Sequence, residues 1–145
     1  MNLKDHTKFK TVFYSGDDIR EWVNKSISPS NNGGIGGGNA VSTVQQVNLY
    51  DKSSNIVGLS LGNATSYDIG SHEYVSYKLT YFFDEGTIDF VISTKDNSSG
   101  RRLNPGKYFS KIYGGTGLYI NVTGYVVFEV LDDRKNIRKI KFYKK

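Results

Sequence analysis

The stretch KIYGGTGLYINVTGYVVFEV, residues 111–130, places four glycines between two runs of strand-forming residues. A phosphate-binding loop would need a lysine followed by Ser or Thr, and then a helix N-terminus whose free N–H groups face the anion. After Gly117 the chain continues instead with β-branched and aromatic residues, which favour a strand. We therefore interpret GGTG (114–117) as a tight turn, and Gly124 as a bulge or close backbone approach where the next strand begins.

The rest of the chain after residue 41 shows the same strand pattern, with apolar and polar residues alternating at a period of two. The intervening segments DKSSN, DEG, LNPG and DDRKN have the composition of turns. Several short strands without a helical segment among them predict an all-β sandwich or barrel. The strands are predicted at Thr43–Tyr50, Asn55–Ser60, Glu73–Phe83, Gly86–Thr94, Lys107–Tyr113, Gly124–Leu131 and Asn136–Tyr143.

The N-terminal part has a different pattern. KFKTVFY, Lys8–Tyr14, predicts a strand, and Ser15 followed by Ile19, Trp22 and Val23 at helical spacing predicts a short amphipathic helix docked through its tryptophan. Residues 28–40 are rich in Gly, Ser and Asn, and this composition predicts a linker. A dinucleotide-binding loop is not expected there, because GGIGGG lacks the spacing of that fingerprint. We thus expect an N-terminal strand and helix arm (1–27), a linker (28–40) and a β-barrel domain (41–145).

The glycine turn and its surroundings resemble the signature shared by dirigent proteins and allene oxide cyclases, over residues 41–143. Upstream, EYVSYKLTYFFDEGTIDFVIS resembles the hairpin that precedes this turn in those families. The resemblance implies an eight-stranded antiparallel barrel, commonly assembled as a trimer, in which Lys8–Tyr14 supplies the eighth strand. The residues that match the turn signature are Gly114, Gly115, Thr116, Gly117, Tyr119 and Gly124.

The reactive residues of those families do not transfer to this chain. Dirigent proteins typically carry a basic residue between the glycine turn and the next glycine, where this sequence has LYINVT (118–123). Allene oxide cyclases bind a fatty-acid epoxide above a glutamate, and no glutamate here aligns with it. The resemblance therefore implies the scaffold without an identifiable catalytic residue.

Candidate ligand-binding residues come from the strands themselves. Glu129 and Asp89 lie mid-strand, where a carboxylate turned into an apolar barrel would act as an acid or base. The alternative is that both point outward or pair with Lys139 or Lys141. Tyrosines could line a cavity or pack in the core or between subunits; they are Tyr74, Tyr77, Tyr81, Tyr113 and Tyr125. Arg101 and Arg102 could hold an anion or be solvated.

Composition narrows the classes of protein. The 145 residues contain no cysteine and only two histidines, His6 and His72, so we expect neither a metal site nor a cofactor. No apolar run is long enough for a membrane span and no apolar signal segment begins the chain, so we expect a soluble, intracellular protein. The abundance of Asn, Lys, Ile, Ser and Tyr is typical of an AT-rich genome.

The net charge of +5 is concentrated near the C-terminus, at residues 134–145. We interpret this basic run as an edge strand protected by lysines; the alternative is weak binding of a polyanion such as nucleic acid. The leading functional hypothesis is a non-catalytic, oligomeric barrel that serves as a structural or binding module. The alternative is a dirigent- or cyclase-like barrel that binds a small apolar ligand.

Overall fold

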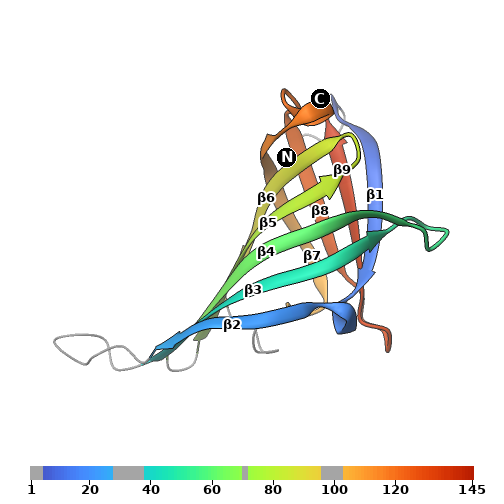
Figure 1. The fold of residues 1–145 in the computed structure, drawn as a ribbon. Helices are drawn as coiled ribbons and strands as arrows, with labels where there is room; N and C mark the ends of the chain where they lie inside the picture. The colour runs from blue at the N-terminus through green and yellow to red at the C-terminus, as the bar shows by residue number, and fades with distance from the viewer. Residues whose placement is uncertain (1–4, 28–37, 70–71, 96–102) are drawn as a thin grey trace.

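The computed structural model describes residues 5–27, 38–69, 72–95 and 103–145 (Figure 1). All strands in this part of the chain belong to one antiparallel sheet in the order β1-β9-β8-β7-β6-β5-β4-β3-β2. A further pairing of β1 with β3 closes eight of these strands into a barrel. The strands are β1 (Thr7–Ser15), β2 (Arg20–Ile27), β3 (Gly38–Tyr50), β4 (Ile56–Ile69), β5 (His72–Phe83), β6 (Gly86–Thr94), β7 (Gly106–Gly115), β8 (Gly124–Val130) and β9 (Ile137–Lys144).

The all-β fold and the eight-stranded antiparallel barrel are confirmed, with β1 as the eighth strand. Each strand predicted after residue 41 is present, and the largest difference is in β4. This strand continues to Ile69, well beyond the predicted end at Ser60. Gly62 and Asn63 have turn-forming chemistry, but β3 and β5 pair with this segment on both sides. A Cβ atom on Gly62 would lie 2.6 Å from a methyl carbon of Leu79, so the glycine permits close packing within the strand.

The predicted N-terminal helix is wrong. Ser15 does cap a helix, since its hydroxyl accepts a hydrogen bond from the Asp17 amide, but this helix is a 3-10 turn of three residues, Gly16–Asp18. The chain then forms β2, whose backbone pairs with β3 from Arg20↔Gln46 to Ile27↔Ala40. The exposed edge of β3 supplies backbone partners that a short isolated helix lacks, and Trp, Val, Ser and Ile favour a helix only weakly. Trp22 remains half exposed rather than docked.

The strand pairing that closes the barrel, between β1 and β3, is short. Strand β1 meets β3 at Phe13↔Tyr50, and after the turn at Gly16–Asp18 the chain returns as β2 along the remaining edge of β3. Figure 1 shows β2 along the lower end of the barrel, with the C-terminus at the opposite end. At the lower end, therefore, the wall is divided between β1 and β9 on one side and β2 and β3 on the other. The predicted linker, 28–40, lies largely outside the described residues.

The upper end of the barrel is filled with aromatic side chains. Phe142 is fully buried and its ring centroid lies within 6.3 Å of those of Tyr81, Phe83 and Phe90. These rings meet mostly edge to face, which adds to the stabilisation from burial alone. The core in this half of the barrel is therefore closely packed.

The GGTG segment lies at this filled end, against the β5–β6 hairpin. Gly117 has a φ of 61°, and the following Leu118 amide donates a 2.9 Å hydrogen bond to the Glu85 carbonyl. The hydroxyls of Thr87 and Thr116 lie 2.7 Å apart, and their backbones exchange two hydrogen bonds. A Cβ atom on Gly124 would lie 1.9 Å from the Tyr143 carbonyl oxygen, so the backbones of β8 and β9 approach closely there.

Candidate functional site

A cavity of about 290 Å³ lies inside the barrel at the lower end, where β1 and β3 separate. Because side chains alternate across a strand, each of the strands that line it contributes residues of its inward face. Strands β3 and β5 contribute Val47 and Leu79, and the opposite wall contributes Phe128. The apolar lining consists of Ile19, Val47, Leu79, Ile92, Leu103 and Phe128.

Polar side chains converge on the same cavity. Of the buried polar and charged residues in the described part of the chain, Gln45, Ser60 and Arg138 line it. Tyr14, Tyr77, Glu21 and Gln46 complete the polar lining. An apolar pocket with a few convergent polar groups is typical of sites for small molecules.

Arg138 is the central charged group of this site. Its side chain is only 3% exposed, and β9 aims it inward on the same face as Ile140 and Phe142. Its Nη1 donates a 2.7 Å hydrogen bond to the Asn136 carbonyl and a second bond to the Asn136 side-chain oxygen. Within the described residues, no carboxylate lies within 4 Å of the guanidinium nitrogens. A buried arginine that makes no ion pair with any described residue thus faces a cavity.

Asn136 and the turn Gly16–Asp18 hold the guanidinium in place. The Asn136 carbonyl also accepts a 2.8 Å hydrogen bond from the Gly16 amide, and the Asn136 amide group donates to Asp17. A Cβ atom on Gly16 would lie 2.8 Å from the guanidinium carbon, so a larger residue there would require the Arg138 side chain to move. The segment that was predicted to start a helix therefore supports the charged group instead.

Two tyrosines lie beside Arg138. Burial raises the pKa of Tyr14 far above its usual value of about 10, and the positive charge of Arg138 offsets only part of that rise. Burial also raises the pKa of Tyr81, and the neighbouring Tyr14 phenol adds to the rise. The Tyr81 hydroxyl is fully buried and makes no well-aligned hydrogen bond in the described structure. Both phenols consequently stay neutral at physiological pH and can donate hydrogen bonds.

Strand β2 adds a carboxylate to the lining. Glu21 pairs in register with Gln45, whose Nε2 donates a 2.8 Å hydrogen bond to the Glu21 carboxylate. Across the described residues, no group of three or more His, Cys, Asp or Glu side chains is arranged to hold a metal ion. The chemistry that the site offers is therefore hydrogen bonding, the guanidinium of Arg138, the carboxylate of Glu21 held by Gln45, and apolar contact.

The residues that the sequence suggested for ligand binding are divided by the barrel wall. Tyr77 lines the cavity and Tyr81 lies deeper in the interior. Asp89 accepts a hydrogen bond from Thr80 and lines a groove on the outside. Glu129 lies between Lys107 and Lys139 in register, on the face of β8 opposite the buried Phe128.

Of the remaining tyrosines, Tyr125 stacks on Tyr143 with ring centroids 4.7 Å apart, on the same outward face of β8. Tyr74 and Tyr113 are exposed. Arg101 and Arg102 lie outside the described residues. The predicted set thus places two members, Tyr77 and Tyr81, inside the barrel.

The sequence interpretation missed Arg138, Tyr14, Gln45, Ser60 and Glu21. It treated the C-terminal basic run as an edge strand, and this is wrong, because β9 lies between β1 and β8. A signal for Arg138 was present in IRKIKFYK, where the period of two puts the arginine on the face of Ile140 and Phe142, and Lys139 and Lys141 on the other. For Glu21 no such signal existed, since its segment was expected to be helical.

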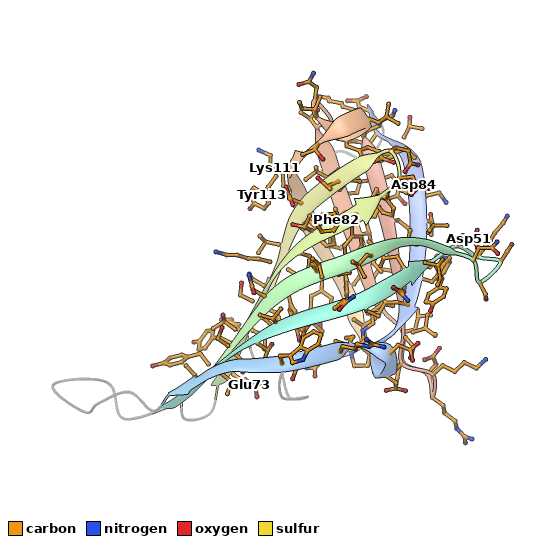
Figure 2. All side chains as sticks on the ribbon, viewed as in Figure 1. Asp51, Glu73, Phe82, Asp84, Lys111 and Tyr113 are labelled. Carbon is orange, nitrogen blue, oxygen red and sulfur yellow. The ribbon has the colours of Figure 1, made fainter. Side chains whose placement is uncertain are left out.

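A second feature lies on the outer surface. Exposed apolar side chains lie next to one another on neighbouring strands: Trp22 pairs in register with Val44, and Leu61 lies diagonal to Phe82. Val44, Leu61 and Phe82 also line a shallow groove. Phe82 and Tyr113 both lie on the outside of the barrel (Figure 2). We call Trp22, Val44, Leu61, Phe82 and Tyr113 the outer apolar face.

Neither of the short helices in the described part of the chain has the length or apolar character needed to cross a membrane. The sequence matches no protein-family model and no curated protein.

Solved structures do resemble the fold. A pterocarpan synthase dirigent protein matches with a TM-score of 0.55 at 16% identity, over 97% of this chain and 94% of its own. The exo-specific intermolecular Diels-Alderase AbnU matches with a TM-score of 0.47 at 17% identity, over 96% and 98%. Pyocyanin demethylase matches with a TM-score of 0.48 at 16% identity, over 92% and 98%. The match to the dirigent protein confirms the resemblance to the dirigent type of barrel at the level of the fold.

Proposed function

We propose that the protein is a non-catalytic binding module that holds a small organic molecule in the cavity at the lower end of the barrel. The observation that carries this proposal is the cavity itself, which combines apolar walls with inward-facing polar groups at one place. Its volume of about 290 Å³ equals roughly ten water molecules, which is room for a ligand of on the order of ten non-hydrogen atoms.

The rigidity of the surroundings supports binding. The walls are formed by paired strands of a closed sheet, and such elements position side chains more precisely than loops do. The filled upper half restricts the ligand to the lower half, because the aromatic rings there leave the Phe142 side chain fully buried. The mid-strand acids Asp89 and Glu129 do not line the cavity, and the carboxylate that does, Glu21, accepts a hydrogen bond from Gln45.

A ligand screen on a matched pair of variants tests the proposal. Val47→Phe adds an aromatic ring to the cavity wall, whereas Val44→Phe adds the same ring to the outside of the same strand. We expect compounds that raise the melting temperature of the wild-type protein to lose this effect on Val47→Phe and to keep it on Val44→Phe. Equal binding to both variants, or a diverse library without a stabilising compound, would contradict the proposal.

We also propose that the barrel forms a homo-oligomer, with a trimer favoured, through the outer apolar face. Contiguous exposed apolar side chains in a folded protein typically mark an interaction surface. Phe82 and Tyr113 are 41% and 67% exposed, which is costly for aromatic rings left in water. Sedimentation velocity of Phe82→Ser beside the wild type checks this: the variant should shift toward the monomer, and a monomeric wild type would refute self-association.

A further inference from the structure

Among the described residues, the positive charge of Arg138 inside the barrel has no carboxylate at ion-pair distance. The guanidinium cannot lose its proton at physiological pH, so burial cannot be relieved by neutralisation. Its hydrogen bonds within the described residues go from Nη1 to Asn136, and the phenols of Tyr14 and Tyr81 are among its other polar neighbours. Glu21 also lines the cavity, but it accepts a hydrogen bond from Gln45 and lies beyond ion-pair distance of Arg138.

An arginine presents five donors in a planar fork that matches two oxygens of an anion. Removal from water strengthens the attraction between this cation and an anionic partner, because less solvent screens the charge. Resting on the proposed function, we propose that the ligand carries a carboxylate or similar small oxyanion that pairs with Arg138.

The remaining lining describes the rest of such a ligand. Leu79, Ile92 and Phe128 offer only apolar contacts, so the body attached to the anionic group is a hydrocarbon chain or ring. The Ser60 hydroxyl and the Tyr14 phenol add neutral donors to the polar side of the cavity. The ligand class is thus a small apolar monoanion, such as an aryl-alkyl or medium-chain carboxylic acid in its ionised form.

Isothermal titration calorimetry with probes of this class tests the inference. The probes are 3-phenylpropionate and octanoate, each compared with its neutral amide of the same shape. Loss of one partner of a buried charge pair weakens binding by about 30-fold or more. We therefore expect at least one carboxylate to bind about 30-fold more tightly than its amide.

Variants locate the effect. Arg138→Met should reduce carboxylate affinity to that of the amide, and Arg138→Lys should weaken it partly, since the ammonium lacks the planar fork. Lys141→Gln is the matched control, because it removes a positive charge from the outward face of the same strand and should change affinity less than twofold. If Arg138→Met does not fold, the affinities of carboxylate and amide are compared on the wild-type protein and on Arg138→Lys, and that comparison still tests whether Arg138 pairs with the anion.

The outcomes separate this inference from the proposed function. Amides that bind as tightly as the carboxylates would overturn the anionic class, while the cavity would remain a binding site. Failure of all four probes would also overturn it, and the library screen with Val47→Phe would still judge the binding module independently. Carboxylate binding that survives Arg138→Met, or that Lys141→Gln abolishes, would assign the charge recognition elsewhere and overturn the inference.

Discussion

Replacement of Gly117 by alanine tests how the glycine turn stabilises the barrel. Gly117 has a φ of 61°, in the left-handed region, and a Cβ atom there would lie 2.4 Å from the Glu85 carbonyl oxygen. That oxygen accepts the hydrogen bond from the Leu118 amide, so the new methyl group would push apart the contact between the turn and the β5–β6 hairpin. Gly114 in the same motif is a natural control, because its nearest contact would be an ordinary 3.4 Å to the Asp89 carboxylate.

The magnitude follows from two costs and one gain. A left-handed conformation costs alanine about 1–2 kcal/mol, and the steric overlap costs about 1–3 kcal/mol. Alanine lowers the conformational entropy of the unfolded chain, which returns about 0.4–1 kcal/mol. The net expectation is a loss of roughly 2–4 kcal/mol in the free energy of unfolding for Gly117→Ala, from a total of about 5–15 kcal/mol. Gly114→Ala should stay within about 1 kcal/mol of the wild type.

Equilibrium urea unfolding followed by tryptophan fluorescence, together with thermal melts, measures both variants. A chain of this length should lose roughly 5–15 °C in melting temperature for Gly117→Ala. The reasoning fails if Gly117→Ala unfolds at the same urea concentration as the wild type, or if Gly114→Ala is equally destabilised. Either result would mean that the contact between turn and hairpin does not support the barrel.

Three further predictions concern the core and the titrating groups. Phe142→Ala should lower the free energy of unfolding by about 3–5 kcal/mol in urea titrations, because it removes the fully buried ring at the centre of the aromatic cluster; a loss below about 1 kcal/mol would contradict the packing described. Tyr81→Phe should be nearly neutral at pH 7, since it deletes a hydroxyl without a well-aligned hydrogen bond. Burial raises the pKa of Tyr81 in the folded state. The stability that Tyr81 contributes is therefore fully present below the unfolded pKa of about 10 and is lost as the pH rises above that value. In urea titrations above pH 10 the wild type should lose stability relative to Tyr81→Phe, and parallel pH profiles of the two proteins would contradict this. Asp51, at the tip of the β3–β4 turn (Figure 2), accepts hydrogen bonds from the Asn55 and Ser53 amides, and these lower its pKa. The stability that the Asp51 carboxylate contributes is present above the unfolded pKa of about 3.9 and is lost as the pH falls through the pKa of the folded state. The difference in free energy of unfolding between wild type and Asp51→Ala should therefore shrink below pH 4, and a constant difference down to pH 2 would refute this prediction.

Much of the barrel was predictable because its signals are local. The alternation of apolar residues identified β5, β6 and β9, and the Asp-Glu-Gly turn identified the hairpin between the first two. Local signals failed where pairing with a distant strand decided the outcome. Ile19, Trp22 and Val23 have helical spacing, yet Arg20–Ile27 form β2 because the edge of β3 offers them backbone partners.

The candidate site was less predictable for the same reason. Alternation states which residues share a face of a strand, but it does not state which side of that strand becomes the interior. Of the residues suggested for ligand binding, Tyr77 lines the cavity, whereas Asp89 lies on the outside of the barrel. Arg138 was assigned to a basic run because its charge suggested solvent, whereas its strand periodicity placed it with Phe142.

By itself the sequence determined the strands after residue 41 and most of the turns between them, because backbone propensity and alternation act over a few residues. The closure into a barrel was implied only by the family resemblance, since it depends on the pairing of β1 with β3. Only the tertiary structure decided where the barrel remains hollow. Tyr14 on β1, Glu21 on β2, Gln45 on β3 and Arg138 on β9 meet because β1 leaves β3 after Phe13 and the chain turns at Gly16. That geometry depends on pairing between segments far apart in the chain, and no local pattern of residues records it.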